Sequence, residues 1–161
     1  MPFTYRVFCR ELASPSLSEV LIWLRQHGNP VRIGGGRSAG DLLSNFWDDV
    51  QLSVHDAEPP LRVQCFRADA VSASRLAEEI ADFVEDIQEL PESEGRARVL
   101  AHLAGTRSVV VVEFPPEGSS SQVQDTAESI LTLFAERAAG FAQRDGVGFL
   151  DEDDEVVLAI G

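Results

Sequence analysis

Apolar and polar residues alternate along the first strand-like segment of the chain. Between Thr4 and Cys9, the side chains of Tyr5, Val7 and Cys9 fall on one side and that of Arg6 falls on the other. A period of two residues is typical of a β-strand with one buried face. We therefore predict a half-buried strand at residues 4–9.

Three longer segments show the helical period instead. The first lies between Ser16 and Gly28 and opens with a Ser-x-x-Glu capping box. The second covers residues 72–90, and its apolar residues form one stripe along the helix. The third lies between Ser121 and Gly140 and opens with a Ser-x-x-Gln cap. Each has one apolar side, so each is predicted to pack on a sheet or on another helix.

The remaining apolar runs are short and are bounded by turn residues, as β-strands are. Residues 50–54 and 61–66 flank a turn-rich loop and predict a hairpin. Residues 108–114 include four consecutive valines, which is typical of a central strand covered on both faces. Residues 141–160 have the pattern of closing β structure, with an Asp-Gly turn near their start.

These elements together predict an α+β protein with a mixed, largely antiparallel sheet and three main helices packed mainly on one face. The order strand, helix, hairpin occurs from Thr4 onward and again from Ser108 onward, which suggests two related halves. Pro91–Gly95 precedes a short helical piece at residues 96–103 and is the one candidate for an internal boundary. A connection of this length is ordinary within a domain, so we predict a single domain over residues 1–161.

The charge of the chain is concentrated in its second half. The net charge is −14, and because acids and arginines balance in the first 77 residues, all of it comes from residues 78–161. A field of this sign repels nucleic acid and anionic membranes and attracts basic proteins. The sequence thus predicts a basic protein as partner, with no nucleic acid and no membrane.

Much of this negative charge follows the predicted helix at residues 72–90. Four carboxylates form one stripe, two lie beside it, and no arginine follows Arg75 on this helix. Like charges one turn apart destabilise a helix by roughly 0.2–0.5 kcal/mol per pair. The six predicted docking residues on this helix are Glu78, Glu79, Asp82, Glu85, Asp86 and Glu89.

A second acidic element is the run Asp151–Glu155, from which Asp151, Asp153 and Asp154 join the predicted docking residues. Acidic runs are often only solvated surface, and that interpretation remains open for both elements. If they are functional, charge sets the rate and specificity of encounter, while affinity needs an apolar or aromatic anchor. Trp23, Phe46 and Trp47 are the aromatic candidates for that anchor.

One glycine-rich loop supports a different hypothesis. Gly34, Gly35 and Gly36 open a stretch that fits the G-x-G-x-x-A dinucleotide pattern, and Asp56 lies at a suitable distance downstream. Glycine runs more often serve tight turns that need a positive φ. A small nucleotide-binding enzyme that uses the Gly34–Ala39 loop is therefore the alternative to a binding module.

The remaining candidate chemistry is sparse. Cys65, His55 and Asp56 have the residue types of a thiol nucleophile, a base and an orienting acid. Cys9 and Cys65 both lie in apolar strand-like runs, so buried, inert thiols are the preferred interpretation. No histidine pairing has the spacing of a metal site, and we expect neither a metal nor a cofactor.

The sequence therefore favours a non-enzymatic protein-binding module, such as an inhibitor or immunity-type protein that blocks a basic partner. The chain has no apolar run long enough for a signal peptide or a membrane span, so we expect a cytoplasmic protein.

Overall fold

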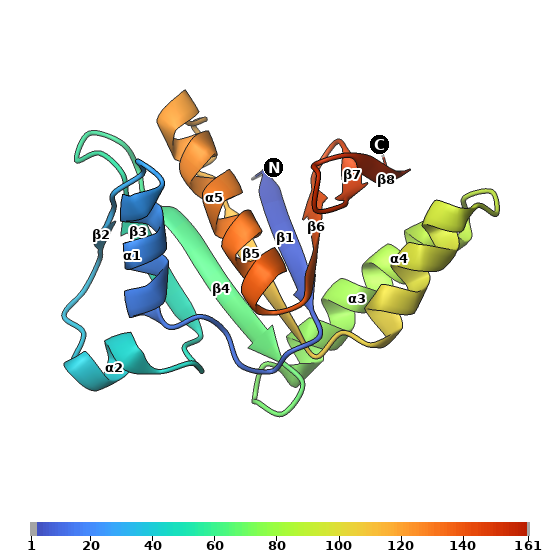
Figure 1. The fold of residues 1–161 in the computed structure, drawn as a ribbon, viewed down its shortest axis with the longest axis horizontal. Coiled ribbons are helices and arrows are strands. Elements are labelled where there is room, and N and C mark those ends of the chain that lie inside the picture. Colours follow the sequence, from blue (N-terminus) through green and yellow to red (C-terminus); the bar gives the residue numbers. More distant parts are fainter. Residues whose placement is uncertain (1–2, 161) are drawn as a thin grey trace.

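The computed structural model describes residues 3–160, and this part of the chain forms five helices and eight strands (Figure 1). In chain order they are β1 (Thr4–Cys9), α1 (Leu17–Gln26), β2 (Arg32–Ile33), α2 (Ala39–Leu43), β3 (Asp49–Ser53), β4 (Leu61–Arg67), α3 (Ala73–Gln88), α4 (Glu94–Ala104), β5 (Ser108–Glu113), α5 (Ser121–Arg137), β6 (Gly140–Arg144), β7 (Gly148–Leu150) and β8 (Val156–Ala159).

The eight strands form one sheet in the order β2-β3-β4-β5-β1-β6-β7-β8. Every pair of neighbours in this sheet is antiparallel. The predicted α+β class with a large antiparallel sheet is confirmed, and within residues 3–160 the sheet has no parallel pair.

The order strand, helix, hairpin occurs twice, as the sequence suggested. β1 and α1 precede the β3-β4 hairpin, and β5 and α5 precede the β6-β7 hairpin. The two units interleave, because β4 lies on the far side of β5 and β6 lies on the far side of β1. The connection from β5 through α5 to β6 skips one strand, β1, which is a split β-α-β arrangement. The chain after α1 instead crosses to the edge strand β2 and returns through β3 to β4, which is separated from β1 by β5.

Helices cover both faces of the sheet, so the prediction that they pack mainly on one face is wrong. α1 and α5 pack on the face that carries Val7, Val110 and Val112. α3 and α4 pack on the opposite face, over Phe8 and Val109. The physical reason is that the central strands are apolar on both sides, and a strand of that kind needs cover on both. β1 is accordingly buried on both faces and is not half-buried.

Two helix boundaries also differ from the prediction. α5 begins one residue earlier, because Ser120 and not Ser121 caps it by accepting a hydrogen bond from the Val123 amide. The short helical piece at residues 96–103 is a complete helix, α4, capped by Ser93. Residues 89–93 form the loop between α3 and α4, and the two helices lie side by side and extend away from α1 and α2 (Figure 1).

A buried arginine at the end of β4 holds two irregular segments against the sheet. The side chain of Arg67 is 2% exposed, and its guanidinium donates to the carbonyls of Leu12 (3.0 Å) and Trp47 (2.8 Å) and to Ser14 Oγ (2.9 Å). Asp48 supplies the nearest carboxylate, at 3.4 Å. Buried charges are tolerated only when they are paired and hydrogen-bonded in this way.

The end of the sheet is closed by α4. Gly95, in the first turn of α4, lies so close to β8 that a side chain there would overlap the backbone carbonyl of Val157. Since alanine normally stabilises a helix relative to glycine, this glycine serves the close packing of α4 on β8 and not helix formation.

We predict that Gly95→Ala destabilises the protein by about 1–3 kcal/mol, the usual cost of overpacking. Gly40→Ala is the matched control, because Gly40 is also helical and its nearest outside atom, Ser38 Oγ, would be 3.7 Å from the new methyl group. The control is expected to be neutral or stabilising by up to about 1 kcal/mol. Urea unfolding of both variants measures the difference, and equal stabilities would contradict the close contact.

We also predict that Arg67→Met lowers the free energy of unfolding by about 3 kcal/mol or more, because it leaves several buried acceptors without a hydrogen-bond donor. Arg62→Met is the control, since the Arg62 side chain is about half exposed and makes one ion pair with Asp49 at 3.5 Å. Exposed pairs contribute at most about 1 kcal/mol. A loss at Arg67 no larger than the loss at Arg62 in urea unfolding would show that the buried network is dispensable.

Candidate functional site

Five of the six predicted docking residues on α3 lie on its outward side. The inward side is apolar: Leu76 and Ile87 are buried, and Ile80 and Phe83 pack beside them against the sheet. The five exposed carboxylates are Glu78, Asp82, Glu85, Asp86 and Glu89, the last of which is the C-cap of the helix. We call these five residues the α3 acidic face.

Little positive charge compensates this face. Glu78 forms an ion pair with Arg75 at 3.9 Å, and both side chains are more than half exposed. Within residues 3–160, the other four carboxylates of the α3 acidic face have no ion-pair partner. The like-charge repulsion along the helix is thus left largely unrelieved.

Glu79 differs from its neighbours, because it is bound to the sheet. Its carboxylate accepts a hydrogen bond from Arg6 Nε on β1 at 2.7 Å. Arg6 also donates to Asp145 and to Gln143, both at 2.9 Å, and its guanidinium lies over the ring of Phe83 at 5.1 Å. The carboxylate of Glu79 therefore anchors α3 to β1, and the structure does not place it with the α3 acidic face.

The acidic run after β7 is a structured turn. Asp151 Oδ1 accepts hydrogen bonds from the backbone amides of Asp153 (2.9 Å) and Glu155 (3.0 Å). Asp154 has a positive φ of 60° and forms an ion pair with Arg144 at 3.4 Å. Three docking residues were predicted in this turn. Of these three, Asp153 is the one that is exposed and whose side chain makes none of these hydrogen bonds or ion pairs.

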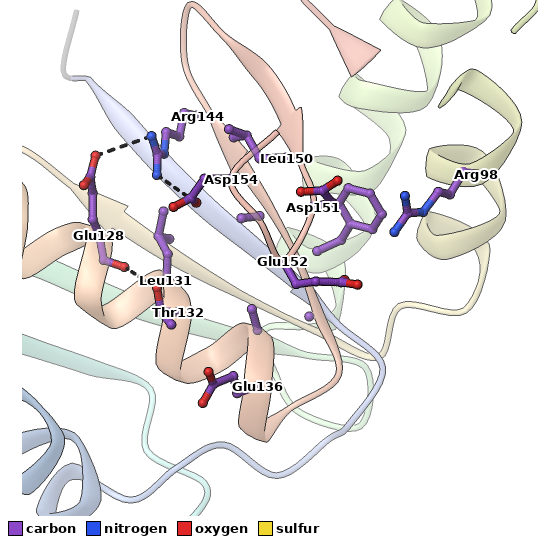
Figure 2. A pocket seen from close by; sticks show the side chains of 14 residues that line it. Arg98, Glu128, Leu131, Thr132, Glu136, Arg144, Leu150, Asp151, Glu152 and Asp154 are labelled. Atoms are coloured by element: carbon purple, nitrogen blue, oxygen red, sulfur yellow. Dashed lines mark hydrogen bonds and ion pairs between the residues drawn. The ribbon is translucent and has the colours of Figure 1, made fainter. Parts of the chain in front are cut away.

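This turn forms one wall of a groove of about 200 Å³, which we call the α5 groove (Figure 2). α5 forms the opposite wall, β6 and β7 form its base, and Arg98 of α4 lies at one end. The apolar residues that line it include Leu131, Ala135, Phe141, Ala142 and Leu150, and its carboxylates are Glu128, Glu136, Asp151, Glu152 and Asp154. The groove contains the turn acids and none of the α3 acidic face, so the two predicted elements line different surfaces.

Two arginines partly neutralise the α5 groove. Arg144 lies between Glu128 and Asp154, at 3.4 Å from each. Arg98 lies over the ring of Phe141 at 5.2 Å. In the described part of the chain, Glu136 and Glu152 have no ion-pair partner. Sequence reasoning missed this groove, because only the acidic run hints at it and its walls come from separate segments.

The glycine-rich loop has an unsuitable setting for a nucleotide. β2 is a two-residue edge strand antiparallel to β3, whereas a dinucleotide fold needs a parallel β-α-β unit. Gly35 has a φ of 82°, as expected for a turn, and Gly34 donates its amide to Gln51. The helix that follows, α2, has five residues, and the carboxylate of Asp41 bonds to its N-cap amide. Gly34, Gly35 and Gly36 thus build a turn, and nothing here favours the nucleotide hypothesis.

The cysteines are placed as inert core residues. Cys9 and Cys65 are both buried and free. Burial raises the pKa of the Cys65 thiol to about 12 and also raises the pKa of Cys9. His55 and Asp56 are exposed, and Asp56 forms an ion pair with Arg32. Residues 3–160 contain no group of three histidine, cysteine or acidic side chains arranged to hold a metal.

Comparison with known proteins gives no relative: no family model, no curated protein and no solved structure matches this chain. Among the described helices, none is both long and apolar enough to cross a membrane.

We predict that neither thiol of the folded protein reacts with a disulfide reagent at pH 8, because the thiolate is the nucleophile and burial suppresses it. The same protein in guanidinium chloride is expected to react at both cysteines. Absorbance of the released thiol gives the count, and rapid labelling of Cys65 in the folded state would overturn its assignment to the core.

Proposed function

We propose that the protein is a non-enzymatic protein-binding module that engages a basic protein partner through the α3 acidic face, with the turn at Asp151–Glu155 as a second element. An inhibitor or immunity-type protein that neutralises a basic partner is the class this surface suits best. A cytoplasmic location stays a prediction of the sequence.

The observation that carries this proposal is the uncompensated charge of the α3 acidic face. Its carboxylates lie on a helix that extends from the body of the protein together with α4 (Figure 1). A mixture of charges would keep the protein soluble without the repulsion that this stripe incurs. A one-signed stripe instead accelerates encounter with a basic protein and discriminates against acidic ones.

Two of the three aromatic candidates for the anchor, Trp23 and Trp47, belong to the core on the opposite face of the sheet from α3. Trp47 is buried, and the indole Nε1 of Trp23 donates to the Ser129 carbonyl at 3.0 Å. Phe46 is exposed, and its ring contacts the guanidinium of Arg67, the last residue of β4. Next to the α3 acidic face, Val71 is fully exposed just before the helix begins and offers an apolar contact.

We predict that the triple variant Asp82→Asn, Glu85→Gln, Glu89→Gln binds the partner more weakly by on the order of tenfold. The partner is captured from the lysate of the native host at low salt, eluted with a salt gradient and identified by mass spectrometry. Binding of the purified partner to each variant is then measured by calorimetry at two salt concentrations. The triple variant is expected to show a smaller loss of affinity on adding salt.

The matched control is Glu11→Gln, Glu117→Gln, Asp125→Asn, which removes the same charge from exposed positions outside α3. It is expected to bind within about twofold of the natural protein, since peripheral charges contribute little. The α3 variant should also unfold at a higher temperature, because repulsion along the helix is relieved. Equal binding by the two variants, or the absence of any basic partner, would refute the proposal.

A further inference from the structure

The α5 groove combines an apolar base with an acidic rim. Leu131 of α5, Phe141 of β6 and Leu150 of β7 line it, and carboxylates from α5 and from the turn after β7 line it as well (Figure 2). Its volume of about 200 Å³ is below the roughly 300–1,000 Å³ of pockets for drug-sized ligands. The groove therefore suits a single side chain.

The charges in the groove favour a cation. Arg144 forms ion pairs with Glu128 and Asp154, and Asp151 Oδ1 accepts hydrogen bonds from two backbone amides. Glu136 and Glu152 are left, one from each wall. Arg144 and Arg98 lie toward different ends of the groove in Figure 2, with Glu152 on the side of Arg98.

The direction of α5 adds to this preference. The groove follows the second half of α5, from Glu128 to Glu136, and the helix ends at Arg137. The carboxyl end of a helix carries a partial negative charge that favours cations nearby. The helix dipole and the unpaired carboxylates thus act in the same direction.

We propose that the α5 groove seats one arginine or lysine side chain of the basic protein partner, with the aliphatic stem on the apolar base and the cationic head between Glu136 and Glu152. Long basic side chains commonly bury their stem on apolar surface and keep the head at a polar rim. This assignment rests on the proposed function, because it presumes that the partner is basic, and it adds a specific contact to the diffuse attraction of the α3 acidic face.

The test uses acetyl-arginine amide as the probe and acetyl-citrulline amide as its uncharged counterpart of the same shape. Both are titrated into the 161-residue protein while its backbone amide signals are followed by nuclear magnetic resonance. We expect the arginine probe to shift the signals of Gly140, Phe141 and Glu152, and to bind about fivefold or more tightly than the citrulline probe, as loss of one charge contact predicts.

Two variants separate the charge from the shape of the groove. Glu136→Gln with Glu152→Gln should weaken binding of the arginine probe by about fivefold, whereas Glu117→Gln with Asp125→Asn should not. Thr132→Trp, at an exposed position on the wall of the groove, should abolish the shifts by filling it. Unchanged binding in the first and third variants, or equal binding of the two probes, would overturn the assignment.

The outcomes also separate this inference from the proposed function. If the α3 triple variant no longer binds the partner but the arginine probe does not bind the α5 groove, the inference about the groove is wrong and the proposed function stands. If the probe binds the groove as described and no basic partner exists, the proposed function fails and the groove remains a cation-binding site.

Discussion

The central strand pair, β1 and β5, has to be covered on both faces, and the arrangement of the helices follows from this constraint. Val110 and Val112 of β5 enter one core and Val109 and Val111 enter the other. α1 and α5 cover the first face, so α3 and α4 are needed on the second. α3 thereby becomes an outer layer with one apolar side against the sheet and one side in solvent.

This position explains how the protein carries a stripe of like charges. Attachment of α3 depends on its apolar side and on the partly buried contact between Glu79 and Arg6, and neither involves the α3 acidic face. The outward carboxylates can therefore repel one another at a cost of tenths of a kcal/mol per pair without detaching the helix. A helix fixed in this way presents its charge in one orientation, as the proposed binding role requires.

The elements were largely predictable from the sequence, because periodicity and caps are local properties. The capping box at Ser16 and the β3-β4 hairpin are both present. Cover on both faces of the sheet was predictable only in part. The valine run of β5 indicated a strand buried on both faces, whereas β1 was predicted to be buried on one face only, because the burial of Phe8 was not recognised. α4 appeared too short in the sequence, because its cap and first turn fall in what looked like a loop.

The site was less predictable, since it depends on which side chains meet across the fold. In the sequence Glu79 lies beside the acidic stripe, as Asp86 does, and only the register of α3 over β1 pairs it with Arg6. Arg67 likewise has no local signal that marks it as buried. The α5 groove requires two helices, two strands and a turn to come together. The acidic run alone therefore indicated the charge of this surface but not the groove.

Hydrogen exchange of the protein with and without its purified partner tests the central claim most directly. The account predicts slower exchange of the backbone amides of α3 and of the turn at Asp151–Glu155 when the partner is bound, and little change near Gly34–Leu43. Slower exchange confined to the Gly34–Leu43 segment, with α3 unchanged, would contradict a binding role for the acidic surface.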